Sequence, residues 1–187
     1  MLIRISGGSG GIKDYLENGQ KQDRFYDRNQ LDERVILNGY LDQTNQLIEN
    51  MENNSDKYFH ITLAFKEDYI ATDVLENIDN DFKDFFLKAY RDDEVNYYSE
   101  VHLPKIKSYE MAGGQTIVRK PHIHIVIPRE NLLSGNSFDP SISHILKNID
   151  SFQEATNAKY GLSSPKDNLR TTFNSSSEMI SRYKGDE

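Results

Sequence analysis

The sequence predicts an α+β fold, with a central antiparallel sheet and helices packed mainly on one face. Residues 58–65 are rich in aromatic and β-branched side chains, and in residues 120–128 two histidines alternate with aliphatic side chains. Both patterns are typical of strands. Residues 72–89 and 142–152 instead repeat apolar side chains at helical spacing. The turn-like segment 111–115 separates two strand-like stretches. Strands flanked by long helices, with at least one hairpin, are typical of this class.

The first 51 residues supply a short strand and two helices. Residues 2–6 alternate apolar and polar side chains and predict a short strand that runs into a glycine-rich loop. A helix is predicted over 12–18, closed by Gly19, and another over 41–51. The polar stretch 20–38 has irregularly spaced apolar residues, so we assign it no element and expect a mobile or partner-ordered connection.

The C-terminal half supplies the hairpin and two longer helices. Thr72 is the expected N-cap of the first helix, whose apolar stripe continues to Ala89. Residues 95–109 and 116–128 form the predicted hairpin, and the last helix ends near Gly161. We expect residues 1–187 to be a single domain, with 162–187 as a tail or linker that continues into a longer protein.

Composition restricts the class of protein. The absence of cysteine excludes disulfides and thiolate metal sites. No apolar run is long enough for a signal peptide or a membrane span, so we expect a protein without membrane insertion. A net charge of −8 argues against a nucleic-acid partner, but the hairpin region is locally basic. Its candidate phosphate-binding residues are Arg119, Lys120 and Arg129.

Histidines in the hairpin predict a metal site. His122 and His124 are two residues apart on a strand, so their imidazoles leave the same face about 7 Å apart. His102 lies on the other strand of the hairpin. A three-residue turn, 112–114, places it opposite His124, whereas a two-residue turn places it on the wrong face. Glu100, on the same face as His102, is the candidate carboxylate that orients a metal-bound imidazole.

Three neutral imidazoles leave coordination positions open for a phosphate oxygen. A metal ion in such a site polarises a phosphodiester toward attack by a nucleophile. If that nucleophile is a tyrosine hydroxyl, the product is a covalent phosphotyrosine, which conserves the bond energy for rejoining. The chain contains 11 tyrosines.

His122-Ile123-His124, preceded by His102, resembles the metal motif of the HUH endonucleases, specifically the relaxases that nick plasmid transfer origins. The segment 13–21 around Tyr15 resembles the N-terminal segment that carries the nucleophile in mobilisation relaxases. The resemblance spans residues 1 to about 161. It implies Tyr15 as nucleophile, with Tyr26 and Tyr40 as alternatives.

The resemblance also implies a cofactor, partners and a location. It implies a divalent metal ion, Mg²⁺ or Mn²⁺, held by His102, His122 and His124. The expected substrate is single-stranded DNA beside a hairpin at a transfer origin. Protein partners implied for the family are a type IV coupling protein and relaxosome accessory proteins, and the implied location is the bacterial cytoplasm. The spacing from His102 to His122 is longer than in many relaxases.

Three other readings remain open. A rolling-circle replication initiator would carry its tyrosine after the histidine motif, where Tyr160 is the candidate. His60-Ile61-Thr62-Leu63 resembles one half of the signature of the metal-independent two-histidine phosphoesterases, but the second half is missing. The last alternative is a non-catalytic DNA-binding module. We expect His60 and His144 to be structural.

Overall fold

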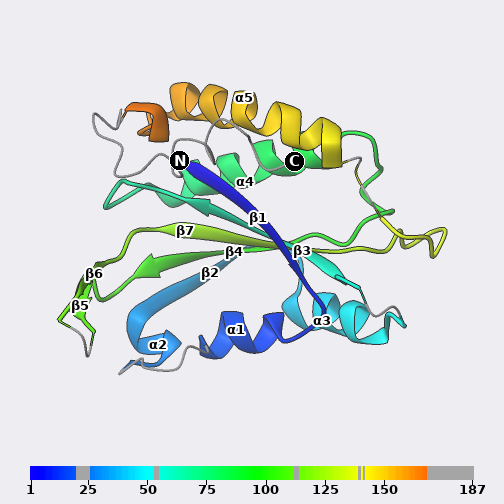
Figure 1. The fold of residues 1–187 in the computed structure, drawn as a ribbon, viewed down its shortest axis with the longest axis horizontal. Coiled ribbons are helices and arrows are strands. Elements are labelled where there is room, and N and C mark those ends of the chain that lie inside the picture. The colour runs from blue at the N-terminus through cyan, green and yellow to red at the C-terminus, as the bar shows by residue number, and fades with distance from the viewer. Residues whose placement is uncertain (20–25, 53–54, 112–113, 139, 141, 168–187) are drawn as a thin grey trace, which may run out of the picture.

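A five-stranded antiparallel sheet forms the centre of the molecule (Figure 1). The computed structural model describes residues 1–19, 26–52, 55–111, 114–138, 140 and 142–167. Across the sheet the strands follow the order β1 (Leu2–Gly8), β3 (Tyr58–Ala64), β7 (His122–Pro128), β4 (Tyr98–Pro104) and β2 (Asp32–Asn38). A separate two-stranded ribbon, β5 (Ser108–Glu110) and β6 (Thr116–Val118), projects from one end. The predicted α+β class is confirmed.

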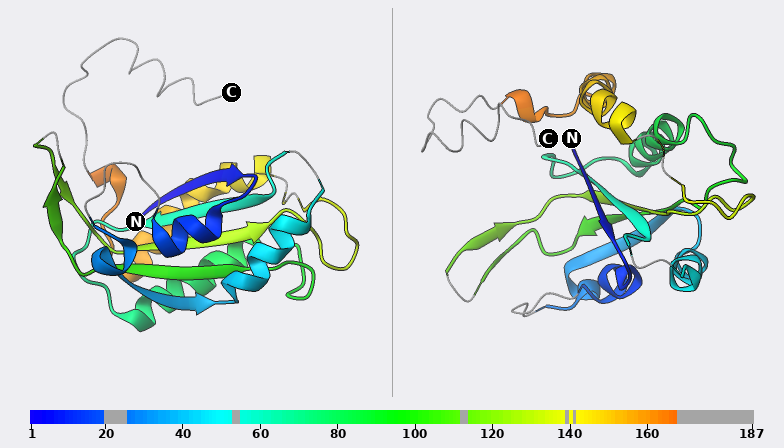
Figure 2. Two further views of the ribbon diagram at one scale, coloured as in Figure 1. Left: turned by 90° about the horizontal axis from the view of Figure 1, so that it is seen from below. Right: turned by 45° about the vertical axis from the view of Figure 1, so that its right-hand side comes forward.

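Helices cover both faces of the sheet, which differs from the expected one-sided arrangement (Figures 1 and 2). The two longest helices, α4 (Thr72–Phe86) and α5 (Ile142–Tyr160), lie on one face. The shorter α1 (Ile12–Asn18), α2 (Arg28–Leu31) and α3 (Leu41–Asn50) lie on the other. Residues 123–128 of β7 are buried, so both faces of this central strand are covered.

The two faces of β7 differ in chemistry. Ile123, Ile125 and Ile127 are fully buried and belong to the main core, which the apolar stripes of α4 and α5 complete. On the opposite face, Val126 joins a smaller apolar cluster with residues of α1 and α3, Leu16 and Ile48 among them. The histidines share this second face, so the short N-terminal helices are packed beside them.

Strand β2 and helix α2 occupy a region to which the sequence assigned no element. The expected irregular connection is therefore wrong for residues 28–38, while 20–25 lie outside the described residues. Val35 and Leu37 of β2 pack against the main core, while the opposite face carries the buried Asp32 and the 60% exposed Ile36. The strand is hard to recognise from its apolar residues alone, because its second face carries a buried charge and an exposed isoleucine.

The register of the hairpin also differs from the prediction. His102 lies opposite His122, and Glu100 opposite His124, whereas the three-residue turn had placed His102 opposite His124. The ribbon itself keeps the predicted register, with Ser108 opposite Val118. Between the pair His102–His122 and the pair Ser108–Val118, the segment that leads from β4 to β5 is two residues longer than the segment that leads from β6 to β7. A shift of two preserves the face of every side chain, so the three imidazoles still converge.

The two ends of the described chain meet. The Met1 ammonium donates hydrogen bonds to Asn157 Oδ1, at 2.7 Å, and to the carbonyl oxygen of Ser163, at 2.6 Å. Residues 162–167 thus dock on the body of the protein, and the rest of the predicted tail lies outside the described residues. Among the described helices, none has the length and apolar character needed to cross a membrane.

A buried carboxyl group of α4 gives the fold a testable pH dependence. Asp79 accepts hydrogen bonds from Tyr97 Oη, at 2.8 Å, and Ser99 Oγ, at 2.6 Å. Burial raises its pKa, and the two hydrogen bonds only partly oppose the shift. The folded protein therefore binds the proton more tightly than the unfolded chain, and this contribution to stability is lost as the pH rises through the folded pKa.

We expect Asp79→Asn to remove this pH dependence and to stabilise the protein at neutral pH, because the amide can serve both hydroxyl groups without a buried charge. Asp79→Leu should destabilise it by about 1–3 kcal/mol for each hydroxyl left without a partner. Urea unfolding of both variants at pH 4 and pH 7 tests the prediction. Equal pH slopes for wild type and Asp79→Asn would contradict it.

Candidate metal centre

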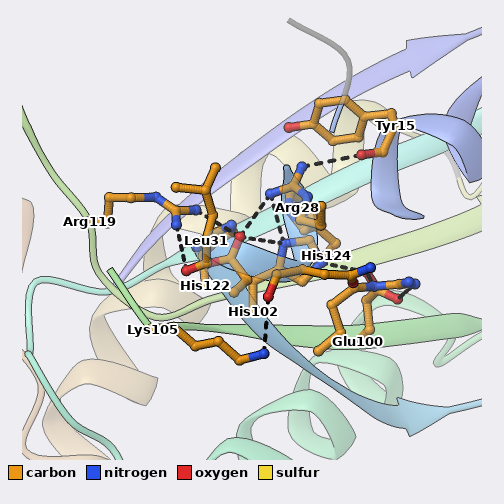
Figure 3. A network of polar contacts seen from close by, with 12 residues as sticks. Tyr15, Arg28, Leu31, Glu100, His102, Lys105, Arg119, His122 and His124 are labelled. Carbon is orange, nitrogen blue, oxygen red and sulfur yellow. Dashed lines mark hydrogen bonds and ion pairs between the residues drawn. The ribbon is translucent and has the colours of Figure 1, made fainter. Parts of the chain in front are cut away.

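Three histidines from two neighbouring strands converge on one face of the sheet (Figure 3). His102 comes from β4, and His122 and His124 come from β7. One potential ligand nitrogen from each lies within 4.8 Å of the others. The ring centroids are 4.6–5.1 Å apart and the rings meet edge to face. The predicted convergence of His102, His122 and His124 is therefore present.

Each imidazole has one nitrogen engaged by a different kind of partner. His122 Nδ1 lies 3.0 Å from the carbonyl oxygen of Lys120, which can only accept, so Nδ1 carries the proton. His124 Nδ1 lies 3.0 Å from His60 Nε2. His102 Nε2 lies 2.5 Å from Glu100 Oε1. Metal-binding histidines characteristically use their second nitrogen in this way, which fixes the ring. The other nitrogen of His102, Nδ1, also lies 3.3 Å from Arg28 Nη1.

The remaining nitrogens fit a cation. His124 is 2% exposed, and its Nε2 is buried without a hydrogen-bond partner among the described residues. A buried polar nitrogen without a partner is costly, and in the tautomer that carries its proton on Nδ1 a coordinated ion would satisfy Nε2. Burial lowers the pKa of His122 to about 4 and the pKa of His124 well below its ordinary value. Both rings are therefore neutral near pH 7, the form that binds metals.

Glu100 occupies the position predicted for an orienting carboxylate. It is fully buried and accepts hydrogen bonds from His102, from Tyr98 Oη at 2.5 Å and from Arg34 Nε at 3.0 Å. Burial alone would raise its pKa, but these hydrogen bonds outweigh that effect and lower the pKa to about 2. Glu100 is thus a fixed anion behind His102.

Tyr15 stands beside this cluster, and the two alternative tyrosines stand elsewhere. The ring of Tyr15 lies 5.7 Å from the ring of His60 and 5.8 Å from that of His124, edge to face in both cases. Gly11, in the left-handed region, begins α1, and Leu16 anchors the helix in the smaller apolar cluster. These contacts place Tyr15 on the flank of α1 that faces the imidazoles (Figure 3).

The alternative tyrosines are more exposed. Tyr26 is 40% exposed and its ring contacts Tyr109 of the projecting ribbon, at 6.0 Å. Tyr40 is 74% exposed and precedes α3, beside an open pocket of about 310 Å³ that Arg34 and Tyr98 also line. Tyr15 is therefore the predicted candidate that the fold brings to the histidines.

The three predicted phosphate-binding residues lie in different places. Arg119 is close to the cluster, but its guanidinium donates to Asp32 Oδ2 at 2.7 Å and to the carbonyl oxygen of Leu31 at 2.9 Å. Lys120 pairs with the exposed Asp68 at 2.5 Å. Arg129 follows the far end of β7 and packs over the ring of Phe59 at 4.0 Å. Lys120 thus flanks the site, and Arg129 lies a strand's length away from it.

Three polar residues of the site were not expected from the sequence. His60, predicted to be structural, contacts His124, and Asp32 and Arg28 are buried at the edge of the cluster. Arg28 Nη1 donates to Asp32 Oδ2 at 3.0 Å and lies 3.3 Å from His102 Nδ1. Spacing alone signals none of them, because they reach the cluster from β3, α2 and β2. The side chain of His144 is not among those described.

No protein-family model, curated protein or solved structure matches the chain. The assignment of a function therefore depends on the site itself. Its chemistry is a set of three neutral imidazoles with a tyrosine at their edge and two buried carboxylates in the same network. Glu100 pairs with His102 and Arg34, and Asp32 pairs with Arg28 and Arg119.

Proposed function

We propose that this protein nicks and rejoins single-stranded DNA at a plasmid transfer origin, through a covalent 5′-phosphotyrosine on Tyr15. His102, His122 and His124 would hold a divalent ion. The observation that carries the proposal is the packing of the Tyr15 ring 5.8 Å from the ring of His124, whose Nε2 is unpaired. A phenol beside a metal centre is the arrangement that transesterification of a phosphodiester requires.

In the proposed reaction, Tyr15 Oη attacks the phosphorus of the scissile phosphodiester. A bond forms between Tyr15 Oη and phosphorus, and the bond between phosphorus and the 3′ oxygen breaks. The phenol loses its proton and the 3′ oxygen gains one, so the products are a 5′-phosphotyrosine and a free 3′ hydroxyl. A bound divalent ion would polarise the phosphoryl oxygen and stabilise the charge that develops on it. Rejoining reverses these steps.

The donor set discriminates between the two expected ions. Imidazole nitrogen suits transition-metal ions better than Mg²⁺, which prefers oxygen ligands in a strict octahedron. Of Mg²⁺ and Mn²⁺, we therefore favour Mn²⁺. The proposed partners are the single strand and adjacent hairpin of the origin, with a type IV coupling protein and relaxosome accessory proteins, in the bacterial cytoplasm.

Formation of a covalent adduct tests this function. We would incubate the protein with Mn²⁺ and a panel of single-stranded oligonucleotides from candidate transfer origins, and look for a species that survives boiling in detergent and disappears with protease. We expect the adduct with Mn²⁺, less with Mg²⁺, and none with excess chelator. Cleavage that is insensitive to chelator and leaves no adduct would favour a metal-independent phosphoesterase. DNA binding without cleavage in the same panel would favour a non-catalytic module.

The rolling-circle alternative receives no support from the position of its tyrosine. Tyr160 ends α5, on the opposite side of the sheet from the histidines, and its hydroxyl donates to Asp81 at 2.7 Å. Reaching the metal centre from there would require the chain to pass through the core. Among the candidate tyrosines, Tyr15 is the one in contact with the cluster.

A further inference from the structure

Among the described residues, the guanidinium of Arg28 contacts both the candidate metal ligand His102 and the backbone of Tyr15 (Figure 3). Its side chain is 3% exposed. Nη1 lies 3.3 Å from His102 Nδ1, and Nη2 donates to the backbone carbonyl oxygen of Tyr15 at 3.2 Å. The guanidinium carbon also lies 5.5 Å from the centre of the Tyr15 ring. Arg28 therefore connects the helix of the candidate nucleophile to a candidate metal ligand.

The nitrogen that Arg28 contacts is the one a metal ion needs. His102 Nε2 faces the Glu100 carboxylate, which accepts but cannot donate, so Nε2 carries the proton and Nδ1 presents its lone pair. That lone pair points to Arg28 Nη1, a permanent donor. One lone pair cannot serve both a guanidinium and a divalent ion. Two cations side by side in a buried site also repel each other with little screening.

The guanidinium of Arg28 could pair more fully with the Asp32 carboxylate. Asp32 Oδ2 already accepts from Nη1 at 3.0 Å, and Arg119 holds the same carboxylate at 2.7 Å. Asp32 Oδ1 is buried without a partner in the described structure, and so is Arg28 Nε. A small movement of the guanidinium toward Asp32 would pair these groups. The same movement would break the contact with the Tyr15 carbonyl oxygen.

We infer that Arg28 competes with the divalent ion for His102 Nδ1, and that its displacement by the ion releases the hydrogen bond between Arg28 and the helix that carries Tyr15. The Tyr15 ring rests in contact with the His60 and His124 rings, so a phosphodiester that bound between the phenol and these two imidazoles would require the ring to move. Metal binding thus opens the space that the DNA needs. The inference rests on the metal site of the proposed function and is independent of the DNA chemistry.

Metal affinity in the absence of DNA tests the competition. Arg28→Met keeps most of the side-chain volume and removes the charge, so we expect it to bind Mn²⁺ about 10-fold more tightly than wild type in a calorimetric titration, within the range usual for coupled sites. Arg91→Met is the matched control, because Arg91 is 70% exposed beyond α4 and its loss changes the net charge equally. Affinity that is unchanged or weaker in Arg28→Met would overturn the inference.

Hydrogen exchange on the wild-type protein keeps the test decisive if Arg28→Met does not fold. Binding usually slows amide exchange near a ligand. Here we expect Mn²⁺ to speed exchange in residues 12–18 while slowing it in β4 and β7. Slower or unchanged exchange in 12–18 would overturn the inference, as would a wild-type protein that binds no divalent ion. Adduct assays are scored separately, so a protein with this metal response but no adduct would refute the nicking function alone.

Discussion

Replacement of Tyr15 by phenylalanine is expected to lower the rate of covalent adduct formation by at least about 1,000-fold, as removal of a nucleophile does in other enzymes. The change deletes one oxygen and keeps the ring that packs on His60 and His124. Stability and metal affinity should therefore stay close to those of the wild type. Loss of adduct in a folded, metal-binding variant would assign the chemistry to this hydroxyl.

Tyr26→Phe and Tyr40→Phe are the matched controls, because both residues were alternatives for the nucleophile and both are exposed. We expect each to form adduct at the wild-type rate. Denaturing gels with a labelled oligonucleotide measure all four proteins under one condition. Full activity of Tyr15→Phe together with loss in either control would transfer the role to that residue. Full activity of all three variants would remove these phenols from the mechanism.

Replacing any one of the three clustered histidines is expected to weaken Mn²⁺ binding more than replacing His60 or Glu100, which contact these histidines from outside the cluster. Losing an outer hydrogen-bond partner typically costs about 10- to 100-fold in metal affinity, so we expect that range for His60→Gln and Glu100→Gln. His124→Ala should exceed about 100-fold, because it removes a ligand atom outright. Calorimetric titration with Mn²⁺ gives all of these affinities without DNA.

Glu100→Gln also tests the expected order of losses in Mn²⁺ affinity. The amide keeps the shape of the side chain but loses the charge that Arg34 and His102 share. Removing one partner of a buried ion pair is costly, so this variant should also lose about 3–5 kcal/mol of stability. Equal metal affinities for His124→Ala and the wild type would show that the imidazoles are not a metal site. A greater loss for His60→Gln than for His124→Ala would reverse the proposed roles.

Much of the fold was predictable because its signals are local. The strand β3, the helices α1, α3, α4 and α5, and the hairpin of β4 and β7 follow from periodicity, caps and turn residues. Two neighbouring histidines at a spacing of two necessarily share a face. The third, His102, needed only an even offset in register, which is why an error of two residues left the cluster intact.

The parts that were missed depend on contacts distant in sequence. Strand β2 carries its charges inward, toward a polar site assembled from several elements, so its apolar pattern is misleading. His60 has the sequence context of an ordinary core strand, and its contact with His124 exists only because β3 pairs with β7. Helices on the second face were not anticipated, because nothing in a single strand shows what will cover its polar side.

The sequence by itself determined the class of fold, two histidines on one face of a strand and a short list of candidate tyrosines. Only the tertiary structure decided which tyrosine meets the imidazoles and that Arg28 and Asp32 share their site. The physical reason is that periodicity fixes the direction of a side chain relative to its own strand or helix. The meeting of α1, α2 and β4 is fixed instead by packing, which couples residues as far apart as Arg28 and His102.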